Sequence, residues 1–402
     1  MLTRQGWLVT GGAVALIVAG RVFGILELFV LGAAAAALVG FSAAFVSLTR
    51  LRLGVARSLA PPRVYAGNPS RVELSIRNDA ARSTPVLRLF DPVTGTRGAE
   101  LLVGPLRPAA VAQAAYRLPT DRRGIVSVGP LEVIVSDPFG LAASSTDAAP
   151  RSELTVFPRI DGIVPVPQTS GYDPHAGAEH PSALGRTGED FYALREYVMG
   201  DDLRRVHWPS TARRDELMVR QDELPWQGRV SVLLDVRRAA HSQESLELAV
   251  SAAASIVTAC WKRRDLVRLA TTDGVDFGFA AGTAHVEAIM EHLAVVPACA
   301  GGTLRGMVES LSATTTSGSL VVVVGGIAET ELAMLTAQRG RFGSVSVVLI
   351  DRSAWDPSAP APTRAAGRGI VRADRDQPFA TAWNRAMHPR AGAAAAVAGR
   401  RS

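Results

Sequence analysis

Two long apolar runs near the N-terminus constrain the fold of this 402-residue chain more than any other feature. The first covers residues 6–20 and breaks at Arg21, and the second covers residues 22–48 with Glu27 as its only charge. About 20 helical residues cross the hydrocarbon core of a bilayer, so the second run suffices, and the first does if Arg21 reaches the far interface. The simplest solution for residues 1–57 is a transmembrane hairpin with helices at about 6–23 and 25–48.

Arginines on either side of this hairpin predict its orientation. Arg4 precedes it, and Arg50, Arg52, Arg57 and Arg63 follow it. Because positively charged flanks stay on the cytoplasmic side, we expect a multi-pass protein of the cell membrane whose later domains lie in the cytoplasm. The alternative is a cleaved signal peptide, whose first two regions Arg4 and the first apolar run would fit. Against it, no small-residue cleavage site is followed by polar sequence.

Composition argues against several classes of protein. The chain is 48% hydrophobic and 20% charged, as expected for globular domains joined to membrane segments. Its net charge of +6 would suit nucleic-acid binding, but Lys262 is the only lysine and the arginines are scattered, so nucleic acid is not an expected partner. Cys260 and Cys299 stand in apolar surroundings, which favours reduced core thiols over a disulfide or a metal cluster. No cofactor is expected.

Residues 58–160 are expected to form an all-β, sandwich-like domain. The run 71–77 alternates polar and apolar residues strictly, as a half-buried strand does, and several short apolar runs follow it with turn residues between them. The stretch 137–141, Asp-Pro-Phe-Gly-Leu, is interpreted as a tight corner rather than a site, because Asp-Pro restricts the backbone.

Two segments are expected to lack regular structure. Residues 161–187 are rich in Pro, Gly and Ser, which predicts a linker. His175 and His180 lie in this linker beside acidic residues, but a loop does not fix their spacing, so we assign no metal site there. The Ala-rich residues 389–402 are expected to form a disordered tail.

Residues 188–228 form the most unusual stretch of the chain. Acidic and basic residues come in clusters of opposite sign with aromatic residues between them, so the segment can neutralise its own charges. One interpretation is a solvated helix and turn. The other, which we favour, is a buried or interfacial network in which arginine forks hold carboxylates. Its expected members are Glu189, Phe191, Arg195, Glu196, Tyr197, Gly200, Asp201, Arg204, Arg205, His207, Trp208 and Arg213.

The order of these residues resembles the signature of the domain of unknown function 58 family. The resemblance implies a bacterial, membrane-anchored protein encoded beside MoxR-type AAA+ ATPases, von Willebrand factor A proteins and transglutaminase-like proteins. It implies no catalytic residue.

Residues 229–388 are expected to form an α/β domain with a doubly wound sheet. Short apolar strands such as 229–235 and 319–325 alternate with helical patterns such as 242–263. Folds of this kind place ligands at the carboxyl ends of their parallel strands. The residues expected at those ends are Asp235, Gly325 and Asp351.

This half of the chain resembles a von Willebrand factor A domain with a degenerate metal site. The metal-dependent adhesion site of that fold uses Asp-x-Ser-x-Ser after the first strand, a Thr in a later loop and an Asp after the fourth strand. Here Asp235 is kept, Arg237 and Ala239 replace the two serines, Thr303 is the candidate threonine, and Gly325 stands in place of the later Asp. A hard cation needs several oxygens, so we expect no metal, and we expect Arg237 or the next arginine to pair with Asp235.

Two function classes remain open. The favoured one, which the family resemblance implies, is a membrane-anchored, non-enzymatic scaffold or adaptor that acts with a MoxR-type AAA+ ATPase, and with other von Willebrand factor A proteins, in cell-envelope biogenesis or complex assembly. The alternative is a hydrolase or transferase that uses His207 with Asp201 or Asp202 and Ser210, because acid–base and nucleophilic catalysis need such neighbours. A His beside a Trp is more often packed and hydrogen-bonded, so no catalytic residue is assigned.

Overall fold

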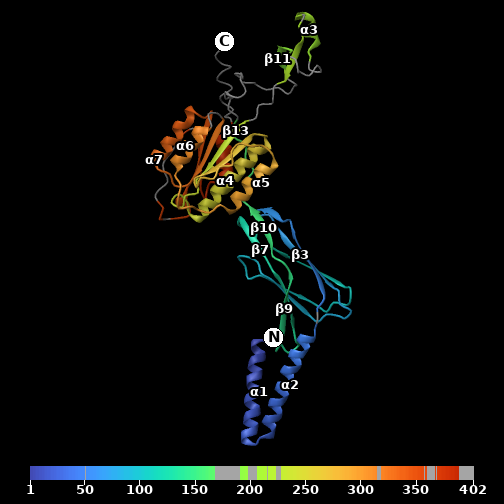
Figure 1. Ribbon diagram of the computed structural model, residues 1–402. Coiled ribbons are helices and arrows are strands. Elements are labelled where there is room, and N and C mark those ends of the chain that lie inside the picture. The colour runs from blue at the N-terminus through green and yellow to red at the C-terminus, as the bar shows by residue number, and fades with distance from the viewer. Residues whose placement is uncertain are drawn as a thin grey trace. The chain divides into compact units, whose positions relative to one another are not determined.

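The computed structural model describes residues 1–49, 51–167, 191–197, 206–214, 216–222, 228–314, 318–356, 358–359, 367 and 369–388. The chain divides into two compact units (Figure 1). The first comprises Met1–Arg159 with Glu291–Val295, and the second comprises Ile160–Met290 with Val296–Ser402.

Two apolar helices open the first unit. They are α1 (Arg4–Phe23) and α2 (Leu26–Leu48), and both are long and apolar enough to cross a membrane. The Thr3 hydroxyl caps α1 by accepting the Gly6 N–H, and Gly24 ends the helix in the left-handed conformation. A Cβ on Gly32 would lie 2.8 Å from the Ile17 nitrogen, so the helices approach closely where glycine leaves room. Two N-terminal apolar helices suggest a membrane anchor.

Ten strands follow in the first unit. They are β1 (Leu53–Ala60), β2 (Arg63–Tyr65), β3 (Arg71–Asn78), β4 (Leu87–Asp91), β5 (Ala99–Val103), β6 (Val111–Arg117), β7 (Gly124–Val128), β8 (Leu131–Ser136), β9 (Ala143–Ala149) and β10 (Ser152–Phe157). They form sheets in the orders β1-β3-β6, β2-β10-β7 and β5-β4-β8-β9, with antiparallel pairing except between β2 and β10. The alternation predicted for residues 71–77 is confirmed, since every second residue of β3 is buried.

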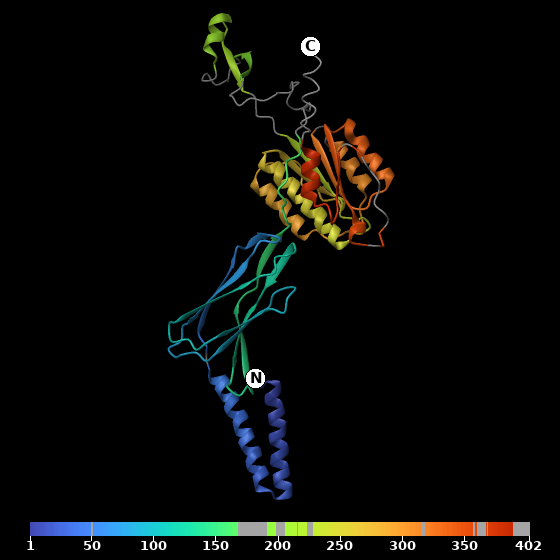
Figure 2. The ribbon, with the colours of Figure 1, turned by 180° about the vertical axis from the view of Figure 1, so that it is seen from behind.

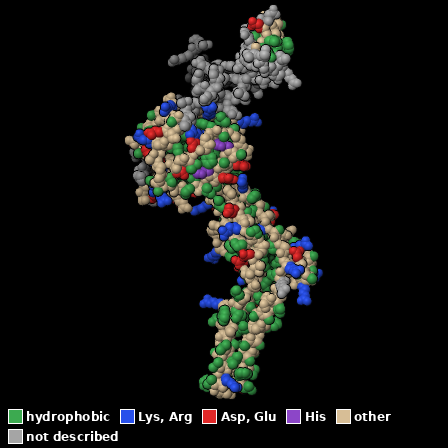
Figure 3. All heavy atoms as spheres, in the orientation of Figure 1, with side chains coloured by type: hydrophobic (Ala, Val, Ile, Leu, Met, Phe, Trp, Pro, Cys, Tyr) green, Lys and Arg blue, Asp and Glu red, His purple; other side chains and the backbone are tan. Residues whose placement is uncertain are grey.

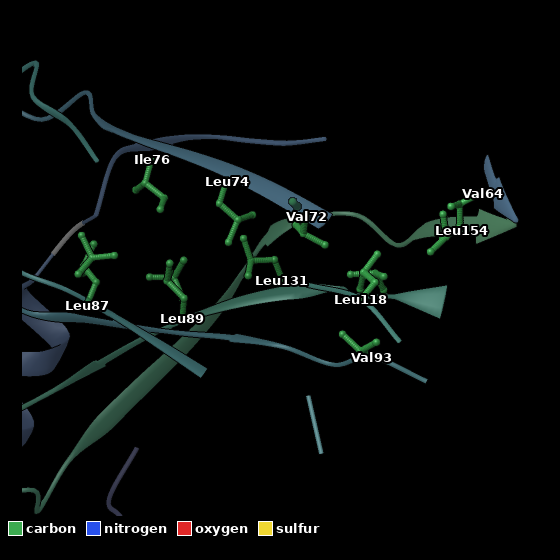
Figure 4. Close-up of a cluster of buried hydrophobic side chains, with 14 of the residues drawn as sticks. Val64, Val72, Leu74, Ile76, Leu87, Leu89, Val93, Leu118, Leu131 and Leu154 are labelled. Atoms are coloured by element: carbon green, nitrogen blue, oxygen red, sulfur yellow. The ribbon is translucent and has the colours of Figure 1, made fainter. Parts of the chain in front are cut away.

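The core of this β region lies between two sheets. Val72, Leu74 and Ile76 of β3 pack in one cluster with side chains from β4 and β8, which belong to the other sheet (Figure 4). Leu87 and Leu89 come from β4. The two sheets therefore bury their apolar faces against each other.

A buried ion pair also links these sheets. Arg57 of β1 contacts Asp91 of β4 at 2.8 Å, and their side chains are only 2% and 1% exposed. Tyr116 of β6 donates to the second Asp91 oxygen at 2.6 Å. Burial, reinforced by this hydrogen bond, raises the pKa of Tyr116, so the phenol stays protonated. Local sequence does not predict this cluster, because its three members, Arg57, Asp91 and Tyr116, come from separate strands.

A parallel sheet organises the second unit. Its strands are β13 (Arg229–Leu234), β14 (Leu266–Thr271), β15 (Ser319–Val324), β16 (Ser344–Ile350) and β17 (Ile370–Ala373), in the order β14-β13-β15-β16-β17. Every residue of β15 is buried, so both faces of the sheet are covered (Figures 1 and 2). The strand order reverses between β13 and β15, which is where such sheets form a crevice at their carboxyl ends.

Helices and short elements complete this unit. They are α4 (Gln243–Lys262), α5 (Thr283–Val295, of which Glu291–Val295 is counted in the first unit), α6 (Leu304–Thr314), α7 (Glu329–Ala337), the 3₁₀ turns η2 (Gln338–Gly340) and η3 (Arg352–Ala354), and α8 (Phe379–Met387). The start of the expected linker packs on α8, where the Trp383 indole N–H donates to the Val164 carbonyl at 2.8 Å and the Asn384 amide accepts the Val164 N–H at 2.9 Å.

A small antiparallel hairpin precedes the parallel sheet in the chain. Strands β11 (Phe191–Glu196) and β12 (Met218–Asp222) pair, and the short helix α3 (Trp208–Arg214) lies between them in sequence. The sequence did not predict these two strands.

Candidate functional site

Asp235 lies at the carboxyl end of β13, beside the point where the strand order reverses. Its side chain is fully buried. Three groups contact its carboxylate: the Arg237 backbone N–H and guanidinium, and the Thr272 hydroxyl. A buried charge needs such partners, and here each oxygen has at least one.

Arg237 supplies the main counter-charge. Its Nε lies 3.0 Å from Oδ1 of Asp235 and its NH2 lies 2.8 Å from Oδ2, in a fork against the carboxylate. The expected pairing of Asp235 with an arginine is confirmed. On the other side, NH1 of Arg237 contacts Glu331 of α7 at 3.0 Å. The hydrogen bond and charge of Asp235, with a smaller contribution from Glu331, raise the pKa of Arg237 against the opposing effect of burial.

Thr272, just after β14, holds Asp235 from a second strand. Its hydroxyl donates to Oδ1 of Asp235 at 3.2 Å and accepts the Val236 N–H at 2.9 Å. We call Asp235, Arg237, Thr272 and Glu331 the Asp235 cluster. The side chains of Arg237 and Glu331 are 20% and 28% exposed, so the cluster presents both signs of charge to solvent.

The loop that contains Thr303 lies beside the cluster. Cys299 exchanges backbone hydrogen bonds with the segment after Asp235, through Val236 and Arg238. A Cβ on Gly302 would lie 1.8 Å from the Thr272 carbonyl oxygen, so this loop reaches Thr272 only because residue 302 is glycine. The Thr303 hydroxyl accepts the Gly306 N–H at 3.1 Å at the start of α6. The hydroxyl that contacts Asp235 therefore belongs to Thr272.

Gly325, at the end of β15, leaves no room for a side chain. A Cβ there would lie 2.1 Å from the Ala240 carbonyl oxygen and 2.8 Å from the His241 ring. The structure thus brings Asp235, Arg237 and Gly325 to the same edge of the sheet, and a carboxylate at position 325 would not fit.

A divalent cation does not fit these residues. Hard cations take six or more oxygens at short range, whereas both Asp235 oxygens already accept from Arg237. Ala239 and Gly325 offer no side-chain oxygen. Elsewhere in the described part of the chain, no group of three His, Cys, Asp or Glu residues is placed to hold a metal.

His241 is a buried base next to the cluster. Its side chain lies against Gly325, and Nδ1 is 3.3 Å from the Ser245 hydroxyl oxygen. Burial lowers the pKa of His241 to about 4, although the nearby Asp235 charge opposes the shift. The ring is therefore neutral at pH 7.

Much of the predicted network in residues 188–228 lies outside the described residues. That holds for Glu189, Gly200, Asp201, Arg204 and Arg205, and for the side chains of Phe191, Arg195 and Glu196. Asp202, which belongs to the enzyme alternative, also lies outside them. The Tyr197 N–H donates to the Leu217 carbonyl at 2.8 Å and continues the hairpin pairing. Trp208 and Arg213 are exposed on α3.

His207 and Ser210, the pair of the enzyme alternative, do contact each other. Nδ1 of His207 lies 2.8 Å from Oγ of Ser210, and the Ser210 N–H donates to the His207 carbonyl at 3.0 Å. Both contacts join residues three apart, which are neighbours on one face of a helix, so they fit a structural role at the start of α3. The same contact is also what a Ser nucleophile and its base would need.

The part of the chain that includes Asp235 is similar to a known family. Residues 193–356 match the family model described as "Protein of unknown function DUF58". The match supports the DUF58 family. The order of residues from Phe191 to Arg213 resembles the signature of the same family. The matched region contains most of the hairpin, α3 and the whole Asp235 cluster. No curated protein matches the chain.

Solved structures offer only slight likenesses. A CARDB domain from Pyrococcus furiosus, solved with di-metal ions, is 14% identical, with 26% of this chain and 93% of that chain covered and a TM-score of 0.22. A β-glucosidase from Erythrobacter marinus is 16% identical, with 26% and 15% covered and a TM-score of 0.18. A β-glucosidase from Listeria innocua in complex with gluconolactone is 14% identical, with 25% and 16% covered and a TM-score of 0.17. These likenesses carry no argument about the fold or function of the chain.

Three members of this site could not be read from the sequence. Thr272, Glu331 and His241 come from a strand end, a helix and a loop, which only the folded sheet brings to Asp235. The one available signal was position, because Thr272 and Glu331 each follow a predicted strand by a few residues.

Proposed function

We propose that this chain is a membrane-anchored, non-enzymatic scaffold or adaptor that acts with a MoxR-type AAA+ ATPase, in cell-envelope biogenesis or complex assembly. The two apolar helices form the anchor, and the β region and the parallel-sheet unit lie in the cytoplasm. Family resemblance motivates the choice of partner, and other von Willebrand factor A proteins belong to the same set of candidates.

In this proposal the parallel-sheet unit is a von Willebrand factor A-like domain that docks without a metal. The position of Asp235 after the first strand, at the reversal of strand order, supports the comparison. At this edge the charge that a cation would supply comes from Arg237, which stays fixed to Asp235 and Glu331.

The proposal rests on one observation, that both oxygens of the buried Asp235 carboxylate are already hydrogen-bonded within the protein. A catalytic carboxylate needs a free oxygen near a substrate, whereas both oxygens of Asp235 are bound by a guanidinium and the residue is fully buried. The partly exposed charges of Arg237 and Glu331 instead suit recognition of a partner surface by complementary charge.

A direct binding measurement tests this function. The full-length protein in lipid nanodiscs is immobilised, and a purified MoxR-type ATPase is passed over it with ATP, with ADP and without nucleotide. We expect saturable binding in at least one nucleotide state and none to empty nanodiscs. Absence of binding in all three states would contradict the proposed partner.

The contact between His207 and Ser210 favours a second candidate, a hydrolase or transferase. An enzyme of this kind would lose turnover of an ester or peptide substrate on His207→Asn or Ser210→Ala with folding intact. A structural hydrogen bond would instead lose only local stability, by about 1 kcal/mol, and no turnover would be measurable before or after the change.

A further inference from the structure

The Asp137–Leu141 turn between β8 and β9 packs against both apolar helices. The Thr3 N–H donates to the Leu141 carbonyl at 2.9 Å, and the Thr3 hydroxyl donates to the Gly140 carbonyl at 2.6 Å. From α2, the Ser42 hydroxyl donates to the Asp137 carboxylate at 2.9 Å. The tip of the β8–β9 hairpin therefore lies beside the N-terminal end of α1 and the C-terminal part of α2 (Figure 1).

The lengths of α1 and α2 show at which height along these two helices the turn lies. At 1.5 Å per residue, α1 is about 30 Å long, which matches the hydrocarbon thickness of a bilayer. Ser42 precedes the last residue of α2, Leu48, by six residues, and so lies about 9 Å inside that end of the helix. A Cβ on Gly6 would lie 2.1 Å from the Leu141 carbonyl oxygen, so the turn is in direct contact with the first turn of α1. The turn is thus level with the helix ends rather than beyond them.

Several polar groups of the turn are paired within the protein. The Asp137 carboxylate accepts the N–H groups of Phe139 and Ala142 in addition to the Ser42 hydroxyl. The Gly140 N–H donates to the Asp137 carbonyl, and the Asp137 N–H donates to the Ala142 carbonyl. Backbone that leaves water must be satisfied in this way, and an ordinary surface turn has no such need.

An aromatic side chain projects from this turn. Phe139 is 53% exposed, and Trp7, one turn into α1, is 66% exposed. Hydrophobic side chains cover the helical hairpin below them (Figure 3). Aromatic residues at this level are typical of the interfacial layer of a membrane.

We propose that the Asp137–Leu141 turn is a third membrane contact, embedded in the interfacial layer of the bilayer with Phe139 against lipid. The contact holds the β region at a fixed depth and orientation on the membrane. This inference rests on the proposed membrane anchoring by α1 and α2, and it adds a lipid-binding surface in a domain that otherwise faces water.

Depth-dependent quenching in the full-length protein tests the inference. Cys299→Ser leaves Cys260, which is fully buried, as the remaining native cysteine. In that background an environment-sensitive fluorophore is attached at Phe139→Cys, at Val14→Cys in the middle of α1, or at Ile125→Cys on β7. Phe139, Val14 and Ile125 are all exposed, so labelling should not disturb packing. The protein is reconstituted in phosphatidylcholine and phosphatidylglycerol vesicles that carry a nitroxide near the headgroup or at the chain end.

The label at position 139 should emit at shorter wavelength than the label at position 125. The nitroxide near the headgroup should quench the label at position 139 several-fold more strongly than it quenches the label at position 125. The label at position 14 should respond most to the deep nitroxide. If position 14 is quenched while position 139 behaves like position 125, the turn lies in water and the inference fails alone. If position 14 also escapes quenching, the membrane anchor fails with it. If the Phe139→Cys variant does not fold, a label at Pro138→Cys repeats the test.

Discussion

Arg237 decides what the carboxyl edge of the parallel sheet can bind. A serine in its place would offer an oxygen to a cation, whereas the guanidinium donates to both Asp235 oxygens and continues to Glu331. A second buried pair, Arg57 with Asp91, links the β sheets. Arginine–carboxylate pairs therefore occur in both units of the chain. The sequence had predicted such pairs in residues 188–228, and these two lie outside that segment.

Removing Arg237 should be costly because it strands a buried charge. We expect Arg237→Met to lower the free energy of local unfolding around β13 by about 3 kcal/mol, since breaking a buried pair leaves the carboxylate uncompensated. Adding Asp235→Asn should restore much of this loss, so that the double variant costs clearly less than the two single changes together. Hydrogen exchange of the β13 amides in the full-length protein measures these values. Small, additive effects would show that the pair is not coupled.

His241 should make stability depend on pH. The pKa of His241 is about 4 in the folded protein, below the ordinary value of 6.5. Between pH 4 and pH 6.5 the unfolded chain therefore binds a proton at His241 that the folded chain does not bind. Stability from this group is complete above pH 6.5 and falls as the pH drops to about 4, by roughly 3 kcal/mol in all. Melting curves from pH 7 to pH 4 should therefore be less steep in pH for His241→Asn than for the wild type. Equal slopes would mean that the ring is protonated in the fold.

At the scale of elements, close backbone approach shapes the site. Gly325→Ala should destabilise the second unit by about 1 to 3 kcal/mol, because the new Cβ would collide with the Ala240 carbonyl oxygen. Gly326→Ala is the matched control, since a Cβ there would lie 3.7 Å from the same oxygen, an ordinary contact. Thermal melts of both variants separate the two positions. A similar loss in both would point to backbone flexibility instead of the collision.

Periodicity made most elements of the second unit predictable. The strand 319–325 and the helix 242–263 were expected within a residue of their observed bounds, because an apolar run and a helical pattern mark them clearly. Strand β9 was missed, because Ala-Ser-Ser-Thr-Asp-Ala-Ala has no apolar alternation and gains its place only by pairing with β8.

Some contacts of the Asp235 cluster could be predicted from the sequence and others could not. The pairing of Asp235 with Arg237 could be predicted because the two residues are neighbours in sequence. The contacts from Thr272 and Glu331 could not, because they depend on which strand lies beside β13 and where α7 begins. Nothing in local sequence encodes that neighbourhood.

At the scale of the whole molecule, the arginines around the two apolar helices predict a cytoplasmic location for the β region and for the parallel-sheet unit. A reporter that is active only in the cytoplasm, fused after Ser402, should be active in intact cells. A reporter that is active only outside the cytoplasm should be silent at the same position. The reverse pattern would move both units, and the proposed ATPase contact with them, to the wrong side of the membrane.

The central claim is that the Asp235 cluster is a docking surface rather than a catalytic or metal site. Glu331 and Glu329 lie two residues apart in the first turn of α7, but only Glu331 contacts Arg237 among the described residues. The deciding measurement is the dissociation constant between the nanodisc-bound protein and the MoxR-type ATPase for Glu331→Gln and Glu329→Gln. If the Glu331 carboxylate pairs with a partner cation at the rim of the interface, that pair is worth about 1 kcal/mol, so we expect roughly fivefold weaker binding for Glu331→Gln and no change for Glu329→Gln. Equal affinity of both variants and the wild type, with folding intact, would contradict the account.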